Sequence, residues 1–181
     1  MFKYLIMAKK KFAKDSVTIM TEMVLPNDTN TLNNLMGGRL MHWMDIVAAI
    51  AAQKHSNRIV VTASADSISF KQPINLGNVV TLKAQVTRAF NSSMEVFIEV
   101  TAEDIPANKK LTTHRAFFTF VAVDQNGRPI EIPELVPQTA EEIELFDGAL
   151  RRRQLRLVLA KRMKPEDAQE LKSIFNLDPV K

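Results

Sequence analysis

A single aspartate stands in an apolar stretch near the middle of the first half of the chain. Residues 40–52 read LMHWMDIVAAIAA, and only His42 and Asp45 among them are polar. A stretch of this length that is apolar at nearly every position predicts a buried helix. A charged carboxylate on such a helix is costly unless it is paired or faces a wet cleft, and loss of solvation makes a carboxylate a stronger base. Asp45 is therefore a candidate general base or nucleophile. The alternative is a core aspartate that bonds His42 or caps another element.

Two asparagines and two glycines precede this helix, in NNLMGG. The free N–H groups of a first helical turn, together with the helix dipole, stabilise negative charge on an oxygen placed there. Gly37 and Gly38 leave that backbone open to a ligand, so the pair predicts an oxyanion hole for acyl transfer. A tight turn is the alternative for the glycines. Helix capping is the alternative for Asn34, because the surrounding NDTNTLNN is rich in residues that form turns and caps.

Five further stretches predict β-strands, because their residues are β-branched or alternate between apolar and polar: 16–24, 58–70, 79–88, 93–103 and 115–123. The phase of the second changes near Asp66, as it would at a β-bulge. The last is apolar on both faces, which indicates an interior strand. A strand, a buried helix and four more strands predict an α+β fold in which an antiparallel sheet wraps round one helix.

The chain changes character after residue 123. Three prolines in GRPIEIPELVPQ predict an extended linker, and TAEE predicts a helix start with Thr139 as N-cap and Glu142 completing a capping box. We expect a charged helix that runs to about Lys164, followed by a short helix beginning at the next proline. The predicted organisation is a domain over 16–137 and a C-terminal helical extension over 138–181.

Composition narrows the function classes. The chain has no cysteine, which excludes disulfides, thiolate catalysis and cysteine-ligated metals and fits the reducing cytoplasm, where we place the protein. Its three histidines lack metal-ligand spacing, so no metal is expected. No run of 18 apolar residues occurs, so we expect no membrane insertion. The N-terminal segment has apolar residues before its lysines, unlike a secretory signal, and Met7 is an alternative start.

The formal charge of +4 is concentrated in RRRQLRLVLAKRMK, residues 151–164, which holds seven basic residues and no acidic one. Such a stretch is able to bind nucleic acid or an anionic membrane surface. A solvated basic helix is the simpler interpretation. Because the chain has one Trp, one Tyr and no base-stacking motif, we expect no nucleic-acid partner.

The ordered segments PNDTNTLNNLMGGRLMHWMD, VTASADSISFKQPI, SSMEVFIEV and FFTFVAVD resemble the hot-dog-fold acyl-CoA thioesterases. This family includes brain acyl-CoA hydrolase and small bacterial acyl-CoA thioester hydrolases. The resemblance runs from about Val17 to Pro137. It implies a curved antiparallel sheet round a long central helix, acyl-CoA as substrate, no cofactor, and homodimers that assemble into a trimer of dimers.

The resemblance also implies site residues. Asp45 matches the catalytic aspartate, Asn34 matches a catalytic asparagine or aspartate, and Gly37 and Gly38 match the glycines at the start of the helix. Coenzyme A contacts are implied along the second strand and at the turn after the third, at Val60, Thr62, Ser64, Asn91, Ser92 and Ser93. Many relatives carry Arg or Lys in that turn, where this chain reads FNSS. Arg88, Lys71 and the C-terminal tail are therefore the candidates for phosphate contacts.

The expected reaction is hydrolysis of acyl-CoA to a fatty acid and coenzyme A. Asp45 either activates water as general base or attacks the thioester to give an anhydride, and the sequence leaves both routes open. A non-catalytic acyl-CoA-binding or regulatory module on the same fold is the alternative. At 1.5 Å per residue, Asp45 lies about 10 Å along its helix from Gly38. The two cannot share one thioester carbon, so the site is expected to need the Asn34 and helix N-terminus of a second chain in a two-fold dimer.

Overall fold

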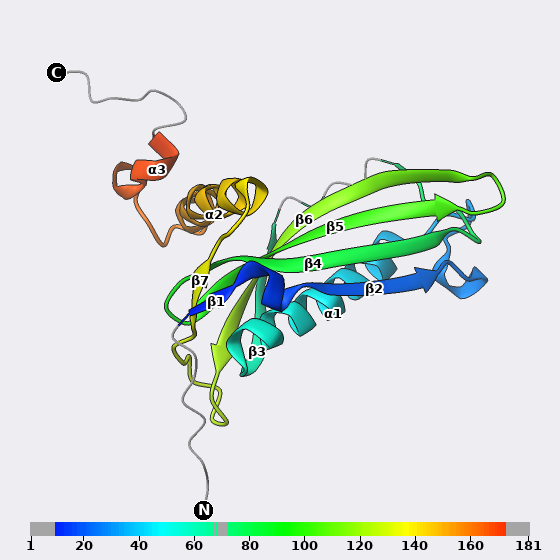
Figure 1. The fold of residues 1–181 in the computed structure, drawn as a ribbon. Helices are drawn as coiled ribbons and strands as arrows, with labels where there is room; N and C mark the ends of the chain where they lie inside the picture. Colours follow the sequence, from blue (N-terminus) through cyan, green and yellow to red (C-terminus); the bar gives the residue numbers. More distant parts are fainter. Residues whose placement is uncertain (1–9, 67, 69–71, 173–181) are drawn as a thin grey trace, which may run out of the picture. The chain divides into compact units, whose positions relative to one another are not determined.

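The computed structural model describes residues 10–66, 68 and 72–172 (Figure 1). The chain divides into two compact units, one up to Val136 and the other from Pro137 onward. The sequence prediction placed this boundary between residues 137 and 138. Each unit is described by itself.

The first unit is built on a five-stranded antiparallel sheet in the order β2-β4-β5-β6-β3. The strands are β2 (Thr18–Met23), β3 (Ile59–Asp66), β4 (Val79–Ala89), β5 (Ser93–Asp104) and β6 (Lys109–Val123). Each overlaps a predicted stretch, and β6 is an interior strand as expected. It begins at Lys109 rather than at residue 115, because the polar residues before Arg115 continue the hairpin with β5.

The predicted helix forms as α1 (Gly37–Ser56) and lies along one face of the sheet (Figure 1). It ends at Asn57, which adopts the left-handed conformation typical of a helix C-terminus. Side chains that alternate along the strands pack against it. The fully buried core includes Leu82, Val86, Met94, Ile98, Met44 and Val47. A curved antiparallel sheet packed round one long helix is the hot-dog fold, as expected.

The prediction that α1 is buried all round is wrong for the single chain. Met41, Ile46 and Ile50 expose 40%, 37% and 41% of their surface. The adjoining edge strand β3 exposes Ile59 and Val61 as well. The sheet of one chain covers only one side of the helix, so an apolar surface remains open along α1 and β3.

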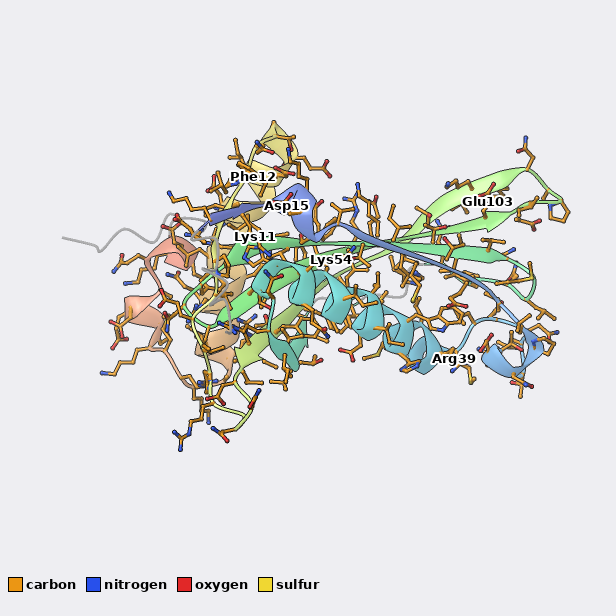
Figure 2. All side chains as sticks on the ribbon, turned by 60° about the horizontal axis from the view of Figure 1, so that its bottom comes forward. Lys11, Phe12, Asp15, Arg39, Lys54 and Glu103 are labelled. Carbon is orange, nitrogen blue, oxygen red and sulfur yellow. The ribbon has the colours of Figure 1, made fainter. Side chains whose placement is uncertain are left out.

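A second, two-stranded sheet was not predicted. Strand β1 (Lys10–Phe12) pairs in parallel with β7 (Glu134–Val136), which lies within the proline-rich linker. The pair is anchored to the C-terminal end of α1, where Lys11 Nζ donates to the carbonyl oxygen of Lys54 at 2.7 Å. Figure 2 shows Lys11 and Lys54 together at this end of the helix and Arg39 at the other.

The β-bulge expected near Asp66 lies a few residues earlier. The register between β3 and β6 shifts between Thr62 and Ser64. Further shifts occur in β4 between Val86 and Arg88, and opposite β5 between Val100 and Thr101. Residues 67, 69 and 70 of the predicted second strand fall outside the described residues, and so does the candidate phosphate contact Lys71.

The second unit contains α2 (Ala140–Leu159), a 3-10 turn (Pro165–Asp167) and α3 (Gln169–Lys172). The predicted capping box is confirmed: Thr139 Oγ1 accepts from the N–H of Glu142 at 3.2 Å, and the Glu142 carboxylate accepts from the N–H of Thr139. The helix ends at Leu159 rather than near Lys164. Within the described residues, none of the helices combines the length and apolar character needed to cross a bilayer.

Candidate active site

Asp45 faces the edge strand β3. Thr62 Oγ1 donates a hydrogen bond to Asp45 Oδ1 at 2.7 Å. The partner of Asp45 is therefore on another element, and is not the His42 suggested by helical spacing. Thr62 lies at the register shift of β3, and bulges of this kind redirect side chains beside functional sites. The carboxylate is half-buried and held by a hydroxyl, which leaves its second oxygen available for chemistry.

Asn30, which was not among the predicted site residues, lies in the loop before α1. Its Oδ1 accepts from the backbone N–H groups of Leu32 at 2.9 Å and Asn34 at 3.2 Å. Two donors on the oxygen fix the orientation of the amide, so its NH₂ group points away from them as a donor for another partner. The sequence does not distinguish Asn30 from the other asparagines of this loop, because each of them also fits a turn or cap.

An ion pair joins this loop to the first turn of α1. Arg39 Nε lies 2.6 Å from Asp28 Oδ1, and Asp28 is 4% exposed. The backbone N–H of Leu25, and next to it the guanidinium of Arg39, hold the pKa of Asp28 below its ordinary value despite the opposing effect of burial. The backbone is tied as well, since the N–H of Met36 donates to the carbonyl of Asp28 at 2.9 Å.

The start of α1 opens onto a cavity of about 310 Å³. Asn30, Asn34 and Gly37 all line it, so the structure brings the predicted Asn34 and Gly37 together. A Cβ placed on Gly38 would meet nothing within 4 Å, so packing within the chain does not require a glycine there. Asp45 does not line this cavity. It lies about 12 Å along the helix from Gly37, at 1.5 Å per residue.

The residues predicted to contact coenzyme A lie at one end of the sheet. Val61 of β3 and Ser93 of β5 both stand opposite Val121 of β6, on either side of it. Two strand spacings separate them, about 10 Å. The β3 stretch with Val60, Thr62 and Ser64 therefore lies near the turn with Asn91, Ser92 and Ser93. Arg88 lies close to this turn, with its guanidinium 5.8 Å from the ring of Phe90.

Across the described part of the chain, no cluster of three or more His, Asp or Glu residues has the geometry of a metal site. The groups described are a carboxylate and a hydroxyl beside β3, and side-chain amides and a helix N-terminus at the cavity. Such groups serve acid–base chemistry and stabilise developing negative charge on oxygen.

Comparison with known proteins identifies the family. Residues 32–107 match the model of the thioesterase superfamily. The uncharacterized acyl-CoA thioester hydrolase YkhA of Bacillus subtilis is 43% identical over 142 residues, which cover 78% of this chain and 83% of that protein. The chain belongs to the thioesterase superfamily.

Solved thioesterase structures share the fold. A hexameric acyl-CoA thioesterase superposes with a TM-score of 0.82 at 38% identity, covering 84% of this chain and 98% of that one. An acyl-CoA hydrolase from Staphylococcus aureus, in complex with butyryl coenzyme A, coenzyme A and coenzyme A disulfide, superposes with a TM-score of 0.78 at 36% identity, covering 84% and 95%. That hydrolase has also been solved with an aspartate, an asparagine or a threonine changed to alanine; the aspartate follows the asparagine by 15 positions and precedes the threonine by 17.

Proposed function

We propose that this thioesterase hydrolyses acyl-CoA to a free fatty acid and coenzyme A, with Asp45 as its catalytic carboxylate. The hydrogen bond from Thr62 to Asp45 carries the proposal, because it fixes a half-buried carboxylate beside an exposed strand. The same aspartate–threonine separation of 17 residues occurs in the Staphylococcus aureus hydrolase, at two of the positions changed to alanine.

The asparagine changed in that hydrolase stands 15 residues before its aspartate. In this chain the residue 15 positions before Asp45 is Asn30. We therefore propose Asn30 as the side chain that donates to the thioester carbonyl, whereas the resemblance had implied Asn34. Asn34 supports it, because its backbone N–H binds the Oδ1 of Asn30. Comparing Asn30→Ala with Asn34→Ala tests the assignment. We expect kcat to fall by roughly 10²–10³ in the first, the usual effect of removing one oxyanion donor, and by far less in the second.

In this mechanism the thioester carbonyl oxygen accepts from the Asn30 amide and from the N–H groups at the start of α1, near Gly37 and Gly38. These donors stabilise the negative charge that develops as the carbonyl carbon is attacked. In one route Asp45 takes a proton from the attacking water, the C–S bond breaks, and that proton passes to the departing coenzyme A thiolate. In the other route Asp45 attacks the carbon, the C–S bond breaks to release the thiolate, and water then hydrolyses the anhydride to give the fatty acid and regenerate Asp45. Single-turnover hydrolysis in heavy-oxygen water distinguishes the routes, because only the anhydride route leaves label in Asp45.

The separation of Asp45 from the cavity supports a site shared by two chains. One helix cannot bring its own first turn, about 12 Å away, to the carbon that Asp45 attacks. The exposed apolar surface along α1 and β3, formed by Met41, Ile46, Ile50, Ile59 and Val61, provides a dimer interface. A two-fold dimer through this surface makes two equivalent sites, each with Asn30 from one chain and Asp45 from the other. Hexameric relatives are consistent with a trimer of such dimers.

Coenzyme A is then substrate and product, and we place it along Val60–Ser64 and the turn Asn91–Ser93. Arg88 is the described basic residue proposed for its phosphates, and Lys71 stays a prediction. A location in the cytoplasm also stays a prediction, although related mammalian enzymes are named cytosolic acyl coenzyme A thioester hydrolases.

The decisive experiment follows release of the coenzyme A thiol from acyl-CoA with a thiol reagent. The purified protein is expected to turn over, and Asp45→Asn is expected to be folded and nearly inactive, since it keeps the shape of the side chain and removes its charge. Asp104→Asn, which changes a carboxylate at the tip of the β5–β6 hairpin, is the matched control and keeps full activity. A non-catalytic binding module would release no thiol. An active Asp45→Asn would restore the interpretation of Asp45 as a core aspartate.

A further inference from the structure

The cavity at the start of α1 contains a buried histidine that the mechanism does not use. We propose that His114 closes the acyl-binding part of this cavity and thereby restricts the enzyme to short acyl groups. The inference rests on the proposed function, because it assumes that the thioester lies beside Asn30 and Gly37.

His114 is placed by a bulge in β6. It stands opposite Val100 of β5 and is 3% exposed, on the inner face of the sheet with Ala116 and Phe118. The register shifts directly before it. His114 pairs with Val100, but Thr101 pairs with Thr112, so β6 has one extra residue between the two pairs. A bulge re-aims a side chain relative to a regular strand. Here it coincides with the point where β6 reaches the cavity.

The lining of the cavity divides by chemistry. Asn30 and Gly37 are the groups proposed to hold the thioester carbonyl. An acyl chain attached to that carbonyl has the rest of the cavity to occupy. The buried side chains there are Leu35, Leu40, Ile74 and His114, whereas Asn34 is half-buried and Gln72 and Pro73 are exposed. The first three are buried apolar residues suited to an alkyl chain, with exposures of 9%, 2% and 3%. The imidazole is the polar member of the buried group.

The volume indicates how much of an acyl chain the cavity covers. About 310 Å³ is at the lower end of the range of ligand pockets. Since a water-sized group takes up about 30 Å³, the cavity holds roughly ten non-hydrogen atoms. An acyl group of up to about eight carbons fits this space together with its carbonyl oxygen.

The polarity of the His114 ring also disfavours long acyl chains. Burial lowers the pKa of His114, so the ring is neutral at physiological pH. A neutral imidazole remains a polar group, and an alkyl chain pressed against it gains less from leaving water than one surrounded by Leu or Ile. Contact with the ring thus opposes longer chains.

The test is the ratio of kcat/KM for dodecanoyl-CoA to that for butyryl-CoA, within a series from acetyl-CoA to palmitoyl-CoA. We expect the native enzyme to prefer chains of about eight carbons or fewer. His114→Ala removes the ring and is expected to raise the ratio at least tenfold, because each additional buried methylene is worth about tenfold or more in specificity. His114→Leu keeps most of the volume, so the ratio is expected to rise by less and the preferred length to stay the same.

His55→Ala is the matched control. His55 is equally buried, lies at the opposite end of α1, and does not line the cavity. Its loss is expected to lower stability without changing the ratio. A His114→Ala enzyme with an unchanged ratio, or a native enzyme that prefers palmitoyl-CoA, would overturn the proposal. If His114→Ala does not fold, His114→Val decides in the same way. Absence of hydrolysis with every acyl-CoA would instead reject the proposed function.

Discussion

The Nε of Arg39 lies 2.6 Å from Oδ1 of Asp28, and this pair fastens the first turn of α1 to the loop that carries Asn30. An arginine in a first helical turn is at the unfavourable end of the helix dipole, and α1 has no acidic residue there to offset it. The buried carboxylate of Asp28 supplies that negative charge. Its other oxygen accepts the N–H of Leu25 at 3.1 Å. The position of Asn30 therefore depends on a buried ionic contact two residues earlier in the chain.

Arg39→Ala is expected to lower the free energy of unfolding by about 1–3 kcal/mol, because the buried Asp28 loses a charged partner while keeping its backbone donor. It is also expected to reduce kcat/KM several-fold, since the loop of Asn30 is no longer tied to the helix. Urea titration and the thiol-release assay measure the two effects. Lys10→Ala breaks the exposed pair with Glu134 and is the control, with a change of less than about 0.5 kcal/mol. Equal stability of the two variants would contradict the role given to Asp28.

The stability of the protein is expected to fall on mild acidification. Burial lowers the pKa of His55, and the nearby charge of Lys11 lowers it further, although the bond to the carbonyl of Pro133 and the carboxylate of Asp15 act in the opposite direction. The pKa of His114 is lowered by burial as well. The unfolded chain, with ordinary values near 6.5, therefore binds protons at a pH where the folded chain does not. This stabilising difference is present above pH 6.5 and is lost as the pH falls below 6.5 toward the lowered values.

Urea midpoints measured between about pH 7.5 and pH 5 check this expectation. His55→Gln removes one titrating group and is expected to make the fall shallower. A midpoint of the native protein that stays constant over the whole range would show that both histidines titrate alike in the folded and unfolded chains.

Thr62→Val is expected to lower kcat by roughly 10- to 100-fold with little change in folding. The substitution keeps the shape of the side chain and removes the hydroxyl that binds Asp45, and hydrogen bonds to charged groups are worth about 1.5–3 kcal/mol. Thr62→Ser restores the donor and is expected to recover most of the activity. Circular dichroism confirms the fold. A Val variant as active as the Ser variant would remove Thr62 from the mechanism.

The main elements of the first unit could be predicted from sequence because their signals are local. Alternation in 79–88 and 93–103 identified β4 and β5 nearly to the residue. The pairing of β1 with β7 could not be found this way, because each strand has three residues and they lie far apart in the chain. Neither segment shows alternation long enough to indicate a strand. The charged start of β6 was missed for a related reason, since its residues there are polar and form the tip of a hairpin.

The site was predictable in its types of residue more than in its geometry. Asp45 stands out because a carboxylate is unusual in an apolar helix. Asn30 does not, because four other asparagines or aspartates within four residues of it fit the same turns. The bond from Thr62 and the cavity lined by His114 join segments that meet only in the folded chain. The prediction that α1 is buried on all sides failed for the single chain because an apolar pattern does not say whether the residues that bury a helix belong to the same chain or to another.

Mixing two inactive variants tests the shared site directly. Asn30→Ala and Asp45→Ala are each expected to be nearly inactive, because every site of a homodimer then lacks one of the two groups. Unfolded and refolded together, random pairing makes half of the dimers mixed, and each mixed dimer contains one intact site. Roughly a quarter of all sites should therefore recover activity. Mixing Asn30→Ala with Thr62→Val gives the same recovery if Thr62 acts with Asp45, and mixing Asp45→Ala with Thr62→Val gives none. Mixed dimers that stay inactive in the first experiment, once proven by differential tagging, would show that each chain holds a complete site.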